Sequence, residues 1–224
     1  AKRTVAATLA ALGLAVGAAA CGAANPSGNG VQAKSSAQIL KAAQTAVRGL
    51  HSVHIAGAVK QRGLALALDL KVAAGAGSTG SVSENGRKFE VVVDRGSVYL
   101  KATSAVWKAL GAGIVGTFLD GKWLKAPATG AYMRVAAFGS APTIFAKIFH
   151  PDAKLVKLAV RRVDGVQAVG LRDADQNASL WVAVNGKPYP VAVTSSVGRI
   201  RFTQFNKPVT ITPPSDAVGV LPAG

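Results

Sequence analysis

The sequence has few of the side chains on which most catalysis and covalent cross-linking depend. Its 224 residues include one cysteine, three histidines and ten acidic residues. A single cysteine excludes an internal disulfide framework and a zinc site built from several thiolates. Ten scattered carboxylates and three imidazoles leave few groups for general acid–base catalysis. The composition therefore disfavours an enzyme.

Aromatic residues make up only 6% of the chain, although half of its residues are hydrophobic. A chain this long and apolar can bury one good-sized core or two small ones, so its net charge of +16 does not make it a disordered polyelectrolyte. The basic residues are scattered, and the longest basic runs are pairs such as Arg87-Lys88. Nucleic-acid-binding arms carry longer basic blocks, so we expect no nucleic-acid partner. Scattered positive charge favours anionic lipid head groups or wall polymers, with a solvated surface as the alternative.

The first 34 residues have the pattern of an export signal and a tether. Lys2 and Arg3 precede an apolar run at 5–16, which is shorter than a membrane-spanning helix needs. Small residues follow, then Cys21, then a polar stretch containing glycine, proline and serine. We predict a signal peptide at 1–20, a lipidated cysteine with a flexible tether at 21–34, one domain at 35–215 and a tail at 216–224.

Cys21 is the candidate lipidation site, because a lone cysteine after such a run resembles the bacterial lipobox. In a lipobox the thiol receives a diacylglycerol and becomes the new N-terminus after cleavage. Stable attachment takes two or more chains, since each buried methylene contributes about 0.8 kcal/mol. Ala18 stands where lipoboxes usually carry leucine, and Ala18 with Ala20 also satisfies the ordinary signal-peptidase rule. We therefore expect an exported protein anchored to the outer face of the cell membrane, with simple secretion as the alternative.

After residue 35 the pattern predicts a helix and then an antiparallel meander. Ser35 and Gln38 have the spacing of a capping box, and apolar residues then recur every three or four positions as far as Leu50. From Leu64 to Val72 large apolar residues alternate with small or polar ones, as in a strand with one apolar face. We predict further strands at 53–60, 88–93 and 97–101.

Most of the large side chains lie between residues 103 and 150, where glycine and alanine interrupt the apolar pattern. We expect short helices there, at 104–118, 128–138 and 141–149. Strands are predicted to resume at 154–163, 166–173, 179–184, 190–197 and 199–205, with a last short strand at 207–214. This order predicts an α+β fold: a single curved antiparallel sheet, a half-barrel of about 9–11 strands, with helices packed on its concave apolar face.

Two short motifs do not have the context that their chemistry needs, and two others are absent. The segment 75–80 matches G-x-G-x-x-G, but a strand and turn follow where a phosphate-binding helix should begin, so we predict a flexible hairpin loop. His51 and His54 straddle a helix–strand junction, and with His150 they are too few for a closed metal site. The sequence contains neither a G-x-S-x-G elbow nor an S-x-x-K motif. We expect no catalytic residues, no metal and no cofactor.

Four segments together resemble the LolA-like superfamily of exported lipid carriers, and more narrowly the actinobacterial LppX/LprAFG lipoproteins. They are the lipobox-like Cys21, the helix-to-strand segment 39–59, the pair 96–107 and 120–126, and the hairpin 180–193 followed by 202–214. Their order and spacing across residues 35–215 carry the resemblance. It implies a strongly curved sheet around an apolar cavity that is closed by helices and accepts acyl chains.

Alternating leucines of the sheet and large apolar residues of the helical region are the candidates for lining such a cavity. A half-barrel with one apolar face must cover that face or fill it with a ligand. The candidate residues are Leu64, Leu66, Leu68, Leu70, Ile114, Phe118, Phe145 and Phe149. For each of them, ordinary core packing is the alternative role.

Together these expectations predict a membrane-anchored lipoprotein. It would bind the acyl chains of a lipid or glycolipid and carry or present that molecule in the cell envelope. We expect a monomer that is held at the membrane through Cys21. The alternative is a non-catalytic accessory, scaffold or sensory lipoprotein with a fully packed core. Such a protein would bind a wall polymer or a partner protein through its basic surface.

Overall fold

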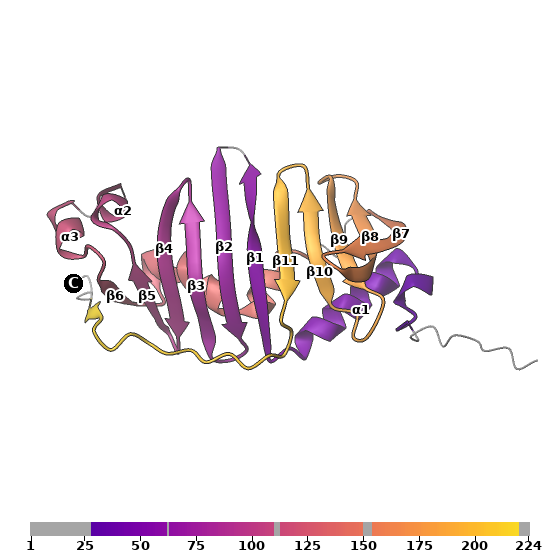
Figure 1. Ribbon diagram of the computed structural model, residues 1–224, viewed down its shortest axis with the longest axis horizontal. Coiled ribbons are helices and arrows are strands. Elements are labelled where there is room, and N and C mark those ends of the chain that lie inside the picture. The colour runs from indigo at the N-terminus through magenta and orange to yellow at the C-terminus, as the bar shows by residue number, and fades with distance from the viewer. Residues whose placement is uncertain (1–27, 62, 110–112, 150–153, 220–224) are drawn as a thin grey trace, which may run out of the picture.

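The computed structural model describes residues 28–219 except 62, 110–112 and 150–153, and in these ranges twelve strands form one open, curved sheet (Figure 1). The strands are β1 (Ser52–Gln61), β2 (Leu64–Ala73), β3 (Gly77–Glu84), β4 (Arg87–Asp94), β5 (Ser97–Lys101), β6 (Trp123–Pro127), β7 (Leu155–Val163), β8 (Val166–Asp173), β9 (Ala178–Ala183), β10 (Pro190–Ser195), β11 (Gly198–Thr203) and β12 (Val218–Gly219). Their order in the sheet is β12-β6-β5-β4-β3-β2-β1-β11-β10-β9-β8-β7. Neighbouring strands are antiparallel except β12 and β6, which are parallel.

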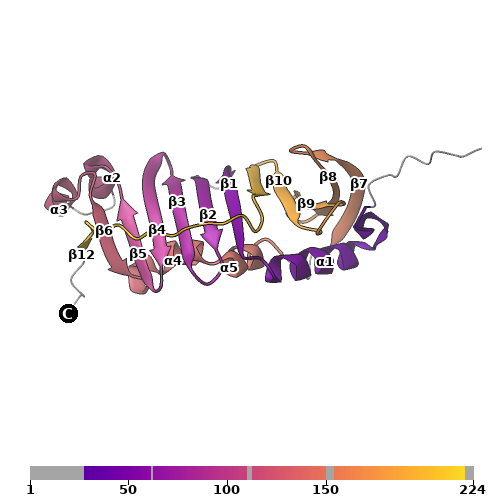
Figure 2. The same cartoon turned by 60° about the horizontal axis from the view of Figure 1, so that its bottom comes forward.

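Helices lie along the concave side of this sheet and at its β5–β6 end (Figure 2). The helices are η1 (Val31–Ala33), α1 (Ser36–Arg48), α2 (Ser104–Ala109), α3 (Gly113–Phe118), η2 (Gly130–Tyr132), α4 (Met133–Ala136), η3 (Ala137–Gly139) and α5 (Ala141–Ala146). Helix α1 lies along the β7–β10 end, and α4, η3 and α5 lie along the other half. In the described residues no helix is both long and apolar enough to pass through a bilayer. The predicted α+β half-barrel with helices on its apolar face is confirmed.

Helix α1 begins at the predicted capping box. The Gln38 backbone N–H donates to Ser35 Oγ over 3.4 Å, and the Ser35 N–H donates to Gln38 Oε1 over 3.1 Å. Two of the otherwise unpaired N–H groups at the start of the helix are thereby satisfied. The apolar face of α1 buries Ile39, Ala43 and Val47, which attaches the helix to the core cluster.

Cross-strand register aligns the alternating apolar residues into rows that run across the sheet. One row crosses seven strands, from β11 to β6, and all of its large side chains are buried. Its residues are Phe202, Ile55, Leu70, Gly80, Val91, Leu100 and Leu124. Phe145 of α5 packs against Phe202 with a ring-centroid separation of 5.1 Å. Burial of each large side chain in this row contributes on the order of 1.5–3 kcal/mol, so the row is what holds the helices on the sheet.

Most predicted strands are confirmed within two residues, but the segment 75–80 is not the predicted loop. It leads into β3, which lies between β2 and β4, and Gly77 and Gly80 are part of that strand. A Cβ at Gly77 would stand 1.8 Å from the carbonyl oxygen of Val93, and one at Gly80 would stand 2.0 Å from that of Asp69. The glycines therefore permit a close approach of three strands, where the sequence pattern had indicated flexibility.

Other boundaries also differ from the expectations. The predicted helix at 104–118 is the two short helices α2 and α3, and the strand β6 follows them where no strand was expected. The predicted strand at 207–214 has no regular structure; this proline-rich segment runs past the ends of the strands, along the lower side of the sheet in Figure 1. Its start is fixed there, since the N–H of the preceding Asn206 donates to the carbonyl oxygen of Ser52 over 2.9 Å and the Ser52 hydroxyl donates to the carbonyl oxygen of Lys207.

The folded region extends beyond both predicted ends of the domain. Asn29, in the predicted tether, donates through its backbone N–H to Val184 O over 2.7 Å and through Nδ2 to Ala183 O over 2.9 Å. Val31 is buried, and at the other end Val218 pairs with Leu124 in the sheet. Cys21 and the predicted signal peptide at 1–20 lie outside the described residues.

The close approach at β3 can be tested with alanine substitutions. Gly80→Ala would place a methyl group against a backbone oxygen at φ +151°, so we expect the free energy of unfolding to fall by about 2 kcal/mol or more. Gly75→Ala is the matched control, because Gly75 also has a positive φ but has open space around it, and it should cost about 1 kcal/mol. Urea denaturation measures both; equal losses would contradict this account of β3.

Candidate functional site

A second cross-strand row of apolar residues lies beside the buried one and is only partly covered. Residues directly opposite one another on eight strands, from β8 to β4, form this apolar row. They are Leu171, Leu180, Val193, Ile200, Gly57, Leu68, Val82 and Phe89. Leu171, Leu180 and Val82 are buried, whereas the other large side chains of the row are half-buried. The concave face thus carries more apolar surface than its helices cover.

At its β8–β10 end the apolar row lines a pocket between α1, the end of α5 and the sheet. The pocket has a volume of about 190 Å³. Its apolar lining consists of Leu40, Ile148, Leu155, Leu171, Ala178, Leu180 and Val193, and its polar lining of Lys147, Asp173 and Gln176. Pockets for whole small molecules are usually at least ~300 Å³. A long acyl chain would therefore need additional space, and the half-covered apolar row is the adjoining surface.

A second, more open depression of about 450 Å³ lies against the polar side of α1. Ser36, Lys41, Gln44, Thr45 and Arg48 of α1 line it together with Ala37, Leu40 and Leu155. Leu40 and Leu155 also line the apolar pocket, so the two hollows share a wall. An apolar pocket beside a basic, hydrogen-bonding depression matches the two parts of an amphipathic molecule.

The four leucines predicted from β2 share the concave face, and their burial is graded along the strand. Leu64 is 42% exposed, Leu66 and Leu68 are half-buried, and Leu70 is completely buried. Burial increases from Leu64, next to the turn of the β1–β2 hairpin, to Leu70, which lies under the helices. These residues are therefore core at one end of the strand and accessible apolar surface at the other.

The four candidates from the helical region separate into two places. Phe145 and Phe149 are buried on the concave side, stacked with their ring centroids 5.8 Å apart. Ile114 and Phe118 lie instead on α3 at the far end of the sheet, 92% and 57% exposed (Figure 1). Helix α3 packs on α2 rather than on the concave face. The structure therefore does not bring these two residues together with the other six.

Several lining residues were not among the sequence candidates. Leu40 lies on the predicted apolar face of α1, and Leu171, Leu180 and Val193 lie in predicted strands. Their alternation indicated a core face. It could not indicate that β10, β11 and β1 are neighbours, because β1 and β11 pair residues about 140–150 positions apart along the chain.

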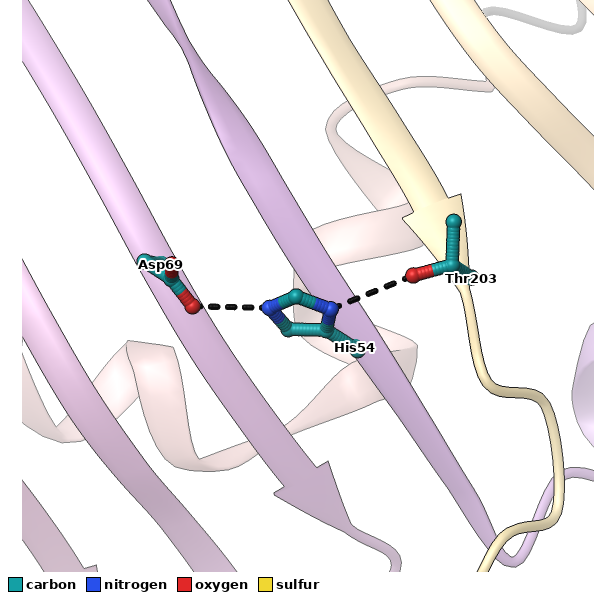
Figure 3. Close-up of polar contacts among 3 residues, drawn as sticks. All are labelled: His54, Asp69 and Thr203. Atoms are coloured by element: carbon teal, nitrogen blue, oxygen red, sulfur yellow. Dashed lines mark hydrogen bonds and ion pairs between the residues drawn. The ribbon is translucent and has the colours of Figure 1, made fainter. Parts of the chain in front are cut away.

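On the convex face His54 joins three strands through its ring (Figure 3). Its Nε2 lies 2.7 Å from Asp69 Oδ1 and its Nδ1 lies 3.1 Å from Thr203 Oγ1. A carboxylate, an imidazole and a hydroxyl in this spatial arrangement also make up a nucleophilic triad. None of the three residues lines either hollow, and the Asp69 side chain is 66% exposed. The geometry supports a cross-strand polar contact that ties β2, β1 and β11 together.

The described ranges contain no cluster of potential metal ligands. Within them, no group of three or more histidine, cysteine, aspartate or glutamate side chains is placed to hold an ion. His150, the third histidine of the chain, lies outside the described residues.

The fold has counterparts among solved structures. LprF from Mycobacterium bovis aligns with a TM-score of 0.51 at 15% identity, covering 80% of this chain and 96% of that chain. The lipoprotein LppX from Mycobacterium tuberculosis aligns with a TM-score of 0.51 at 16% identity, covering 79% and 98%. Neither a comparison with protein-family models nor one with curated proteins finds a match. The chain thus shares the fold of LprF and LppX, and the resemblance seen in its sequence is confirmed at the level of the fold.

Proposed function

We propose that this chain is an exported lipoprotein that binds the acyl chains of a lipid or glycolipid between its helices and the concave face of its sheet. The apolar row carries the proposal, because it continues across eight strands and ends in an apolar pocket. The basic depression against α1 would receive the polar part of the same molecule. The fold shared with the lipoprotein LppX supports this assignment.

Lipidation of Cys21 would hold the protein at the outer face of the cell membrane. The first residue fixed on the sheet by the described contacts is Asn29, eight positions after Cys21. Eight residues span at most about 28 Å when fully extended. The proposed anchor would therefore keep the β8–β9 end of the sheet within a short distance of the membrane.

Binding would require the helices that cover the sheet to move. The cover over β2–β5 consists of α4, η3 and α5, which have four, three and six residues. Such short helices have little stability of their own and are held by packing on the buried row. Each methylene transferred from water into the apolar interior contributes about 0.8 kcal/mol, so a long acyl chain can offset the loss of some of these contacts. The proposed activity is binding and release, without a chemical step.

Polar substitutions in the apolar row test where the acyl chain binds. We expect the double variant Leu68→Gln/Ile200→Gln to bind a fluorescent long-chain fatty acid about tenfold or more weakly, because two half-buried apolar contacts become polar. Val156→Gln/Val166→Gln is the matched control. Both of these valines are exposed and lie outside the core clusters, so binding should not change.

Two results of this titration would contradict the proposal. The first is no uptake of fatty acid or glycolipid by the unmodified chain, which would favour an accessory lipoprotein with a packed core. The second is equal weakening by the row variant and the control variant. Urea denaturation of all variants separates a loss of binding from a loss of folding.

A reversible cross-link tests the movement of the cover. The backbone of Gly139 in η3 approaches β4 so closely that a Cβ there would stand 3.0 Å from Val93 Cβ, which is shorter than the 3.5–4.5 Å typical of a disulfide, so the bond requires a small outward shift of η3. With Gly139→Cys/Val93→Cys oxidised, we expect uptake of the fluorescent fatty acid to slow at least about tenfold, and preloaded ligand to be retained. Reduction of the same sample is the control and should restore exchange. Equal exchange rates before and after reduction would show that η3 need not leave the sheet.

A further inference from the structure

We propose that the outer face of α3 is a docking surface for an anionic lipid membrane. Its apolar residues are Ile114, Val115 and Phe118, which are 92%, 59% and 57% exposed. Ile114 and Phe118 are four positions apart and therefore share one face of the helix. We call these three residues the α3 tip. The tip lies outside the acyl-binding face, and its proposed role does not depend on that activity.

The exposure of the tip follows from how α3 packs on α2. Gly116 faces α2 so closely that a Cβ there would stand 2.9 Å from Trp107 Cβ. Trp107 is buried, and its Nε1–H donates to the carbonyl oxygen of Leu119 over 3.2 Å. With Gly116 against α2, the larger residues of α3 are directed outwards.

The base of the α2–α3 hairpin is fixed by further hydrogen bonds. Asp120 Oδ1 accepts from the Ser104 N–H over 2.6 Å, and the Gly121 N–H donates to Ala102 O over 3.0 Å. The hairpin is thus tied to the ends of β5 and β6. These hydrogen bonds hold the tip in one orientation. An apolar segment without such bonds could fold back on the core instead.

Basic residues outnumber acids on the hairpin and on the strands beside it. From residue 101 to residue 125 the chain carries four lysines and one acid, Asp120, whose carboxylate accepts the Ser104 N–H. Lys122 Nζ lies 3.9 Å from the centre of the Phe118 ring. On the adjoining strands Lys101 lies over Trp123 at 5.8 Å and Lys125 over Tyr99 at 5.7 Å.

This combination matches the chemistry of a membrane interface. Apolar side chains enter the boundary between head groups and acyl chains, aromatic rings lie at head-group level, and lysines contact anionic head groups. Each lysine near an anionic surface adds about 1 kcal/mol to its attraction. A protein partner with a purely apolar groove would not require the basic surroundings, so charge complementarity favours the lipid surface.

Helix α3 and strand β9, to which Asn29 is bonded, are at different ends of the sheet (Figure 1). Eight strand-to-strand spacings separate β9, where Asn29 is fixed, from β6 beside the hairpin. At ~4.8 Å each they amount to about 40 Å, which exceeds the reach of the eight-residue tether. The tip would therefore give the protein a second, independent point of contact with a lipid surface.

Vesicle co-sedimentation of residues 22–224 tests this directly, because that chain keeps every described residue and lacks the proposed anchor. We expect binding to vesicles of phosphatidylglycerol and phosphatidylcholine, weaker binding in high salt, and little binding to phosphatidylcholine alone. Ile114→Ser/Phe118→Ser should lower the partition coefficient about tenfold or more. Lys108→Gln/Lys122→Gln should lower it by about tenfold on anionic vesicles only.

The matched control is Val156→Ser/Val160→Ser, which removes two exposed valines of β7 at the opposite end of the sheet and should leave the partition coefficient unchanged. The proposal is overturned if the unmodified protein does not bind anionic vesicles. It is also overturned if the tip variants bind them as strongly as the unmodified chain does. Concentration-dependent dimers that disappear in the tip variant, without vesicle binding, would assign the surface to a second copy instead. Fatty-acid uptake by the same variants should be unchanged, which keeps this test separate from that of acyl binding.

Discussion

The structure depends on the cross-strand register that places every second residue of the central strands on one apolar face. Ile55 lies opposite both Leu70 and Phe202, although Phe202 is 147 positions further along the chain. A slip of one residue in either pairing would turn the leucines of β2 or the phenylalanine of β11 to the convex side. The register therefore decides at once which face the helices cover and which residues hold them.

The two neighbouring rows give this face two different roles. The buried row, which runs from Phe202 through Leu70 to Leu124, fastens the short helices to the sheet through contacts such as that of Phe145 with Phe202. The apolar row beside it is left half-covered and meets a pocket of about 190 Å³. A face that is partly core and partly accessible can keep the protein folded while leaving apolar surface for acyl chains.

The sequence predicted most of the elements, but less of the site. The capping box of Ser35 and the alternation from Leu64 to Val72 are local signals, and both predictions are confirmed. The first half of strand β3 was missed, because Gly77 and Gly80 resemble a loop until the neighbouring strands are in place. The position of Phe118 could not be predicted either, because an apolar helix face does not indicate whether it turns towards the core or away from it. The pocket depends on strand neighbours far apart in the chain, which no local pattern reveals.

The most direct measurement is native mass spectrometry with lipid extraction on residues 22–224, purified gently from an actinobacterial host. The account predicts a stoichiometric lipid that remains with the protein and whose extracted acyl chains identify the ligand class. A chain that shows only its own mass, and takes up neither added fatty acid nor glycolipid, would contradict the account. The apolar row would then be the edge of an ordinary packed core.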